Sequence, residues 1–542
     1  MATRHQSSSE DEKVGLDHEV EFIDHKGAAE KASHEGHAPT SVLAQVAEQE
    51  KQLSTWQSVK KYWVVFLWCM YISIGAAIGG YDGTVAGAVI SIPSFREDLG
   101  DWIDGQWVVS AAWQSGFNGG SSCGGVLGGL CTGYLGDKIG RRGSLLVASI
   151  ISIAAIFLEV FCIHESQVMF FLGRTFNGFG GGIFVTVASS YCAEISPLQL
   201  RGITTGAVNE WIVIGQFLSS VIIKGTGQLT STLAYKIPLG IQWIFPLMIL
   251  IGLPFVPESP WYFVRKNRMD SAKRSVQRLI GHTGADIDLH VAQIKETIEL
   301  EERLTGQAKW IDLFKGTDAR RTFITAMVFI CQEMVGVQFV LGYSTYFFEL
   351  AGFNTSDSFS LGVGTLGIAF VGNLLGIAFT NHLGRRPIFV WGMVACTIDC
   401  LMIAILSLVP GNGALWAMGV FTMLYMLVYQ AGIGPLAYCI YAEISSARLR
   451  SKTVAWGVMI NQAFGLLITV INPYLINPNE ANLQGKVGWI FGGFGVIFTI
   501  WSYFGIPETS GRTIDEIDIL FARKVPARKF SKYVITEADR AE

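Results

Sequence analysis

The chain has 542 residues, of which 50% are hydrophobic and 15% are charged, and its formal net charge is −4. Soluble domains carry about 25% charged residues, so this composition argues against a soluble protein. The small net charge and the absence of a basic run in the sequence argue against a nucleic-acid-binding surface. All 9 cysteines lie in apolar stretches, at spacings typical of neither a metal site nor a disulfide framework. We expect a membrane protein without a metal or other cofactor.

The chain begins with a polar segment, residues 1–58, which is charged and poor in aromatic residues. This composition predicts a disordered tail. The first apolar run starts only near Tyr62, so the sequence shows no cleavable signal peptide.

Twelve apolar runs follow, each long enough to cross a hydrocarbon core about 30 Å thick. The expected spans are 62–80, 106–131, 144–163, 167–190, 203–223, 238–256, 322–349, 360–381, 388–408, 414–440, 453–475 and 487–506. They define an N-terminal six-helix half (59–257), a helical linker (258–320), a C-terminal six-helix half (321–507) and a tail (508–542).

An internal repeat relates the two halves. The loop at 133–142, after the second span, ends in Gly-Arg-Arg, and the loop at 381–386, after the eighth span, does the same. The Glu-Ile-Ser loop at 194–201 is matched by a second one at 443–450. Alternating-access transporters are built from such repeats, with the substrate site between them near the midplane. The pattern predicts an all-α transporter fold with a central site.

Lys and Arg gather in the loops after every second span and in the linker, whereas the opposite loops are nearly free of them. Cytoplasmic loops carry such an excess, so we expect the linker and both termini to be cytoplasmic. The Asn-x-Ser/Thr sequon at Asn354 falls on the opposite side, where it is a candidate glycosylation site.

Acidic and basic residues also recur at matched positions in the cytoplasmic loops. We interpret them as a gate that holds the halves together at the cytoplasmic end when the site faces outward, although positive-inside topology alone also accounts for the basic residues. The gate residues are Asp137, Arg141, Arg142, Glu194, Arg201, Arg385, Arg386, Glu443 and Arg450.

These loops resemble the major facilitator superfamily and, within it, the sugar porter family. The Gly-x3-Asp-x2-Gly-Arg-Arg loop at 133–142 marks the superfamily. Pro-Glu-Ser-Pro at 257–260, Pro-Glu-Thr-x-Gly-Arg at 507–512 and the loop at 194–201 mark sugar porters. The ordered set covers about 60–525. The resemblance implies the twelve-helix major facilitator fold, plasma-membrane location and sugar transport rather than catalysis.

Within that family, the stretches at 235–243, 342–348 and 448–453 look most like fungal α-glucoside (maltose-type) permeases. The resemblance implies proton-coupled import of α-glucosides, with a sugar and a proton as partners. A porter of a hexose, a polyol or a secreted metabolite is the alternative, with or without coupling. A sugar sensor is disfavoured because about 35 residues follow the last span, and a membrane enzyme because no catalytic constellation appears.

Asp82 lies near the expected outer end of the first span, and Arg174 lies in the fourth. A carboxylate at membrane depth costs about 3 kcal/mol, so an intramembrane acid is a functional hypothesis. The resemblance implies that Asp82 carries the proton and that Arg174 is its counter-charge. The alternative is that Asp82 lies at the water boundary where the helix ends.

The family's motifs also place polar side chains at the sugar site, namely Asn209, Gln332, Glu333, Gln338, Tyr438 and Asn461. Many members carry larger side chains at Asn209 and Tyr438, and a Tyr at Gly342. These departures indicate a wider pocket that suits a disaccharide. Glu333 adds an acid that can form a hydrogen bond with a sugar hydroxyl or titrate. For each of these polar residues, the alternative to sugar binding is a hydrogen bond between helices.

Overall fold

The protein was analysed as a computed structural model that describes residues 55–103, 106–162, 166–284, 286–305, 309–446, 449–477, 480–510, 512 and 514–533. The predicted N-terminal tail therefore lies outside the described residues up to position 54, and its last residues belong to helix α3 (Thr55–Lys61).

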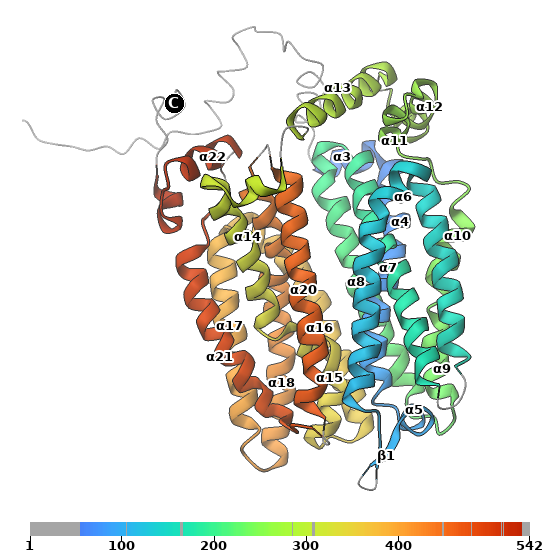
Figure 1. The fold of residues 1–542 in the computed structure, drawn as a ribbon, viewed down its shortest axis with the longest axis vertical. Helices are drawn as coiled ribbons and strands as arrows, with labels where there is room; N and C mark the ends of the chain where they lie inside the picture. The colour runs from blue at the N-terminus through green and yellow to red at the C-terminus, as the bar shows by residue number, and fades with distance from the viewer. Residues whose placement is uncertain are drawn as a thin grey trace, which may run out of the picture.

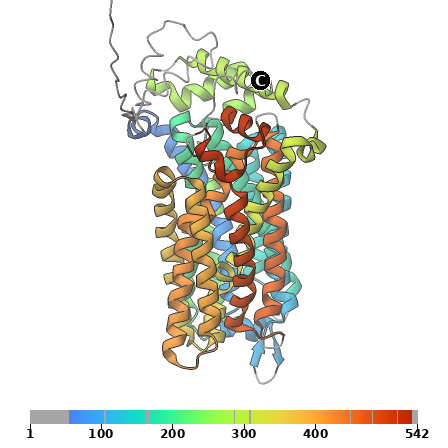
Figure 2. The ribbon, with the colours of Figure 1, turned by 90° about the vertical axis from the view of Figure 1, so that its left-hand side faces the viewer.

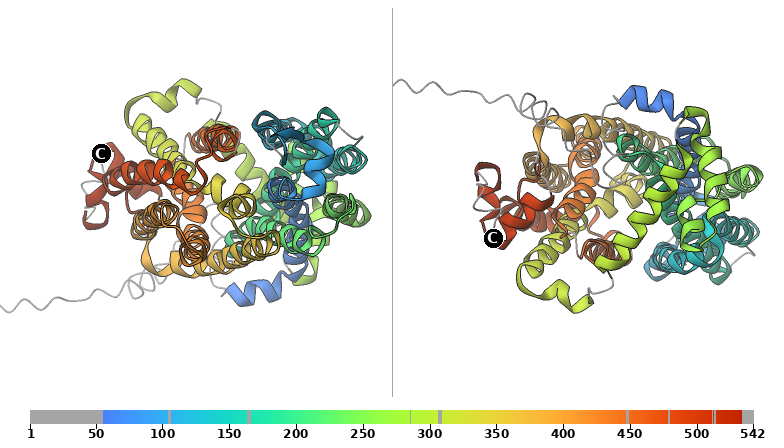
Figure 3. Two further views of the ribbon diagram at one scale, coloured as in Figure 1. Left: turned by 90° about the horizontal axis from the view of Figure 1, so that it is seen from below. Right: turned by 90° about the horizontal axis from the view of Figure 1, so that it is seen from above.

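Two bundles of long helices stand side by side (Figure 1), and the views along the bundle show them end on (Figure 3). The N-terminal half contains α4 (Trp63–Val89), α5 (Pro93–Leu99), β1 (Asp101–Ile103), β2 (Gln106–Val108), α6 (Ala111–Val160), α7 (Gln167–Ile195), α8 (Leu198–Thr226), α9 (Leu233–Ile241) and α10 (Ile244–Gly252). The C-terminal half contains α14 (Gly316–Met334), α15 (Val337–Ala351), α16 (Thr355–Leu383), α17 (Arg385–Leu406), α18 (Asn412–Val428), η3 (Tyr429–Ile433), α19 (Gly434–Ile444), α20 (Arg450–Ile476), η4 (Gln484–Lys486) and α21 (Val487–Gly505).

The linker and the C-terminal segment cover one end of the bundle, which we call the linker end (Figure 2). These segments contain α11 (Pro260–Arg265), α12 (Met269–Ile280), η1 (Gly281–Thr283), α13 (Ile287–Thr305), η2 (Trp310–Phe314), α22 (Ile514–Ala522) and η5 (Ala527–Lys532). The opposite end carries the antiparallel β1–β2 pair, and we call it the hairpin end (Figure 1).

Eleven described helical segments are long and apolar enough to cross a membrane. One of them, α6, has 50 residues and contains the second and third predicted spans, which meet at Gly140 with φ +80°. Its two arms run back alongside each other, because Ser121 in the first and Glu159 in the second belong to one side-chain cluster described below. The all-α prediction with twelve crossings in two halves is therefore confirmed.

The sixth span consists of α9 and α10, which Gln242 and Trp243 separate. Two further spans are interrupted by a change of backbone conformation that the apolar pattern did not predict. Gly336, with φ +102°, separates α14 from α15 in the seventh span. The π-helical segment η3 separates α18 from α19 in the tenth span. Such π segments occur mostly as single turns, often at functional sites. Apolar periodicity did not reveal either break, because the residues on both sides remain hydrophobic.

The first helix continues to Val89, nine residues past its predicted end at 80. Gly87 lets this extension pack closely against α15, because a Cβ at that position would clash with the carbonyl oxygen of Gly342. Asp82 therefore lies inside the helix, with 4% of its surface exposed, and its predicted position near the helix end is wrong.

The two halves meet where α4 packs against α15, α6 against α20, and α8 against α16. At the hairpin end, Arg96 forms an ion pair with Glu349 at 2.7 Å. The side chain of Asn477 accepts hydrogen bonds from Gln114 at 3.0 Å and from Tyr346 at 3.1 Å. These contacts join α5 and α6 to the C-terminal half, so the hairpin end is closed by polar contacts.

We predict that Glu349→Arg lowers the thermal midpoint of the detergent-solubilised protein and that Arg96→Glu/Glu349→Arg restores it. Loss of an exposed ion pair costs about 1 kcal/mol of folding free energy, and loss of a buried one costs about 3 kcal/mol. This pair is partly buried, so we expect a cost between these limits. Asp288→Lys is the control, since Asp288 pairs with Lys273 on the exposed linker. An unchanged midpoint in Glu349→Arg, or no recovery in the double variant, would contradict this role.

Candidate functional site

A buried ion pair lies between α4 and α7. The guanidinium of Arg174 donates to the carboxylate of Asp82, and no part of Arg174 is exposed. Asn177, one helical turn after Arg174, donates to the same carboxylate at 2.8 Å, and Ser121 of α6 donates to it at 2.8 Å. The structure thus brings Asp82 and Arg174 together and surrounds the carboxylate with three donors.

The cluster continues through two side chains that the sequence reasoning missed. Asn177 also donates to Gln242 at 2.9 Å, and Gln242 donates to Glu159 at 3.2 Å. Gln242 lies between α9 and α10, and Glu159 lies in the second arm of α6, both without exposed surface. The available signal was Glu159 itself, an acid inside an apolar span. Sequence alone could not show that it faces Arg174.

A second polar cluster surrounds the break between α14 and α15. Glu333 accepts hydrogen bonds from Gln338 at 3.1 Å and from Asn461 at 3.2 Å. Gln332 donates to the hydroxyl of Tyr429 at 2.7 Å, and Asn461 donates to Gln332 at 3.4 Å. Four predicted sugar-site residues therefore meet, on α14, α15 and α20. Tyr429, in η3, was missed because the break that turns it inward was not predicted.

The two other predicted sugar-site residues lie elsewhere. Asn209 of α8 donates to Asn373 of α16 across the two halves at 3.5 Å. Asn373 in turn donates to Glu210 at 2.5 Å, and neither partner was predicted. Tyr438 packs its ring against Phe329, with 47% of its surface exposed. Asn209 therefore lies at a contact between the halves, and Tyr438 is half exposed on α19.

A pocket between the halves contains Gly342, where many sugar porters carry a Tyr. Among the described residues, no atom would lie within 4 Å of a Cβ at this position. Its lining includes Thr84, Ala88, Ser220, Gly342, Thr345 and Phe359. The missing side chain thus leaves space on the interface between α4, α8 and α15.

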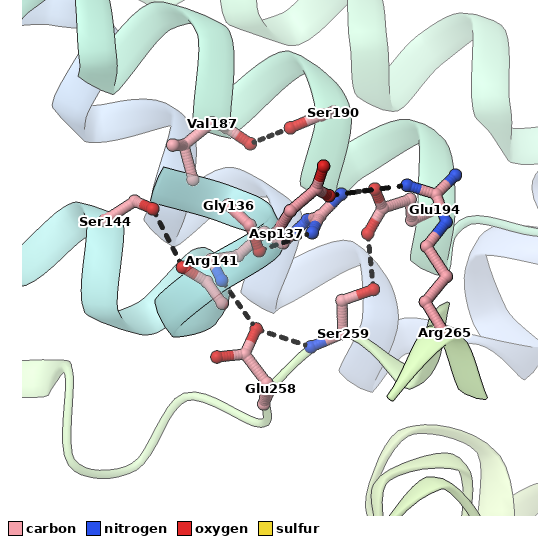
Figure 4. Close-up of polar contacts among 11 residues, drawn as sticks. Gly136, Asp137, Arg141, Ser144, Val187, Ser190, Glu194, Glu258, Ser259 and Arg265 are labelled. Atoms are coloured by element: carbon pink, nitrogen blue, oxygen red, sulfur yellow. Dashed lines mark hydrogen bonds and ion pairs between the residues drawn. The ribbon is translucent and has the colours of Figure 1, made fainter. Parts of the chain in front are cut away.

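At the linker end, several predicted gate residues form one cluster in the N-terminal half (Figure 4). Arg141 donates to Glu194 at 2.5 Å, and Ser259 donates to the other oxygen of Glu194. The carboxylate of Glu258 accepts the backbone N–H groups of Arg141 at 2.9 Å and Arg142 at 3.1 Å. This carboxylate therefore caps the second arm of α6.

The C-terminal half repeats this arrangement. Arg385 forms an ion pair with Glu443 at 3.0 Å. Glu508 accepts the backbone N–H groups of Arg385 at 3.0 Å and Arg386 at 3.2 Å. Thr509 donates to Glu443, as Ser259 does to Glu194. The Pro-Glu-Ser-Pro and Pro-Glu-Thr segments thus have one structural role, in which their Glu binds the N-terminus of a membrane helix.

Each capping carboxylate lies against a glycine at the turn before the capped helix. A negative group at a helix N-terminus binds free N–H groups and meets the positive end of the helix dipole. Gly140 and Gly384 both have φ +80°, and a Cβ at Gly140 would clash with Glu258. Burial raises the pKa of Glu258, and the backbone N–H groups that it accepts offset part of that rise.

The remaining predicted residues lie at the helix ends and in the adjoining segments. Asp137 lies 3.8 Å from Arg265, and both side chains are well exposed. Arg201 lies in the first turns of α8, and Arg450 begins α20. Asn354 caps α16 by accepting the N–H of Asp357 at 2.8 Å. The described ion pairs at the linker end each join groups of one half or of its attached segments, so a gate between the halves stays a prediction.

We predict that Gly140→Ala lowers the free energy of unfolding by at least about 1–2 kcal/mol, because a left-handed backbone is costly for Ala. The clash with Glu258 adds to this cost. The thermal midpoint, followed by tryptophan fluorescence in detergent, measures the effect. Gly133→Ala is the control on the same helix, since its Cβ would meet no described atom within 4 Å. Equal midpoints for the two variants would contradict the capping role.

The fold is similar to that of solved sugar transporters. An inward-open structure of the xylose transporter XylE from E. coli superposes with a TM-score of 0.68 at 20% identity, covering 84% of this chain and 99% of that one. The proton:xylose symporter XylE bound to 6-bromo-6-deoxy-D-glucose gives 0.66 at 20% identity, covering 86% and 100%. At this identity the similarity establishes the major facilitator fold.

The sequence is also similar to curated yeast proteins. The general alpha-glucoside permease of Saccharomyces cerevisiae is 32% identical over 495 residues, which are 90% of this chain and 80% of that protein. Maltose permease MAL31 of the same species is 32% identical over 492 residues, 89% of this chain and 80% of that protein. The family model "Sugar (and other) transporter" matches residues 68–521. The chain therefore belongs to the sugar transporter family, as a multi-pass membrane protein.

Proposed function

We propose that the protein imports α-glucosides such as maltose together with a proton across the plasma membrane, with its linker end in the cytoplasm. The buried pair of Asp82 and Arg174 is the observation that carries the proposal, since an intramembrane acid with a basic partner is typical of a proton pathway. The substrate class rests on the yeast permeases. The orientation rests on the basic residues at the linker end. Asn354 would then be a candidate glycosylation site outside the cell.

Alternating access supplies the cycle. Polar contacts join the halves at the hairpin end, whereas the described ion pairs at the linker end lie within one half. We assign this conformation to the inward-facing state. Turning outward requires breaking the contacts of Arg96 and Asn477. The charged clusters around Arg141 and Arg385 would then approach each other and close the cytoplasmic end as the predicted gate.

Asp82 is the proposed proton carrier. A carboxylate beside a guanidinium is stabilised in its charged form, and one that loses this partner in an apolar site takes up a proton. Asp82 and Arg174 both lie in the N-terminal half, so we infer that rearrangement inside this half, driven by the change of access, alternates these conditions. A proton moving down about 100 mV releases about 2.3 kcal/mol, and one pH unit adds about 1.4 kcal/mol. The sum supports several-hundred-fold accumulation of the sugar, since each 1.4 kcal/mol is about tenfold.

The cluster around Glu333 is the proposed sugar site in the C-terminal half. Its amides and carboxylate already satisfy one another, so a sugar would replace these hydrogen bonds by its hydroxyls. Asn209 and Glu210 on α8 face the same interface from the N-terminal half.

Uptake of radiolabelled maltose in a host that lacks α-glucoside transporters tests the substrate class. We expect saturable uptake that unlabelled maltose and other α-glucosides inhibit, whereas hexoses and polyols do not. Inhibition by hexoses or polyols alone, or no uptake by protein shown to be at the surface, would overturn the α-glucoside assignment.

We predict that Asp82→Asn abolishes maltose accumulation against a gradient but retains maltose counterflow, because the exchange of bound sugar needs no proton. Counterflow into preloaded vesicles and net uptake at an imposed pH gradient measure the two activities. Asp101→Asn, an exposed acid on β1, is the control and should retain both. Undiminished accumulation in Asp82→Asn would remove Asp82 from the proton pathway.

For the sugar site, we predict that Asn461→Ala raises the KM for maltose about tenfold, because a lost hydrogen bond that leaves a buried partner unsatisfied costs about 1–3 kcal/mol. Met459→Ala is the control on the same helix, where the side chain is exposed, and should keep the wild-type KM. A KM that stays unchanged in Asn461→Ala would place the sugar elsewhere.

A further inference from the structure

Glu159 is the acid in the buried cluster that the coupling scheme has not yet used. It is completely buried, the neutral amide of Gln242 donates a hydrogen bond to its Oε2, and the neutral amide of Asn177 also acts on it as a hydrogen-bond partner. The other carboxylate oxygen, Oε1, is buried without a hydrogen-bond partner. Space for this side chain is made by Gly173, whose Cβ would lie 2.8 Å from Cγ of Glu159. A buried acid with an unsatisfied oxygen is costly, so an apolar residue would pack better here.

Arg174 carries the matching unsatisfied donor. One end of its guanidinium binds Asp82, but its Nε is buried without a partner. Arg174 and Asp82 are the charged groups that act electrostatically on Glu159, from α7 and α4 respectively. From the junction of α9 and α10, the neutral amide of Gln242 contacts it through a hydrogen bond. One cation therefore acts on two buried carboxylates and pairs with Asp82 in this conformation.

We propose that Glu159 is the alternative counter-ion of Arg174, which turns to it when Asp82 takes up the transported proton. The step rests on the proposed proton coupling. A proton from water forms an O–H bond with the Asp82 carboxylate, and Arg174 keeps all its protons and remains a cation. Its ion pair with Asp82 is exchanged for one with ionised Glu159. When Asp82 releases the proton to water on the other side, Arg174 returns.

The exchange solves an electrostatic problem. A buried cation that loses its partner is strongly destabilised, so protonation of Asp82 alone would leave Arg174 uncompensated. With Glu159 as the second partner, the proton-loaded cluster is neutral and can accompany the sugar through the conformational change.

A double-mutant cycle on maltose counterflow tests this proposal. In Asp82→Asn, Arg174 can still pair with Glu159, and counterflow should persist. In Glu159→Gln it can still pair with Asp82, and counterflow should persist as well. The double variant leaves Arg174 without a carboxylate, so we expect counterflow to fall at least about tenfold below the product of the single effects. The matched control is Asp82→Asn/Asp399→Asn, because Asp399 is a buried acid on α17 of the other half. In this control the effects of the two substitutions on counterflow should multiply independently.

A second readout uses Glu159→Gln alone. Without an alternative partner, Arg174 holds Asp82 more tightly in its charged form, so the pH of half-maximal maltose uptake should fall by about one unit. Glu159→Asp keeps the charge and should stay closer to the wild type. Glu159→Met also removes the charge, and it takes the place of Glu159→Gln if the latter does not reach the membrane. A purely structural role would change the amount of protein but not this pH.

The outcomes separate the two proposals. Additive effects in the cycle, or an unchanged pH profile in Glu159→Gln, would overturn the role of Glu159 and leave that of Asp82 standing. Accumulation that survives in Asp82→Asn would overturn the proton coupling itself, whatever the cycle shows.

Discussion

The structure depends on one requirement, which is that the guanidinium of Arg174 cannot stand alone in the interior of a membrane bundle. It has no exposed surface, so a carboxylate must lie beside it. Asp82 meets this need from α4, and Asn177 and Ser121 complete the coordination of its carboxylate. Any event that neutralises Asp82 must therefore change the position or the partner of Arg174. Protonation is thereby linked mechanically to the packing of the N-terminal half.

At the linker end, the repeated sequence motifs form the same helix-capping arrangement in both halves. In each half, a glycine with φ +80° lets a carboxylate reach the next helix N-terminus, from Glu258 in one case and from Glu508 in the other. Each carboxylate fastens a connecting segment to its own half. This fastening favours movement of each half together with its connecting segment, while polar contacts such as the ion pair of Arg96 and Glu349 join the halves at the hairpin end.

Sequence patterns predicted the parts of the fold that depend on apolar length and on short motifs, including the two halves, the twelve crossings and the matched loops. The resemblance to sugar porters selected Gln332, Glu333, Gln338 and Asn461, which the structure brings together. It could not predict the helix breaks at Gly336 and η3, because apolar composition continues through both. Glu159 was missed for a different reason, since its meaning depends on contacts between helices that are distant in sequence.

The most direct test of the account is to add maltose to an unbuffered suspension of cells that produce the protein in a host without α-glucoside transporters, and to record the external pH. Entry of a proton with each sugar removes protons from the medium, so the account predicts immediate alkalinisation that an uncoupler abolishes. Maltose uptake without a change in external pH would contradict the account, because the buried pair of Asp82 and Arg174 would then carry no proton.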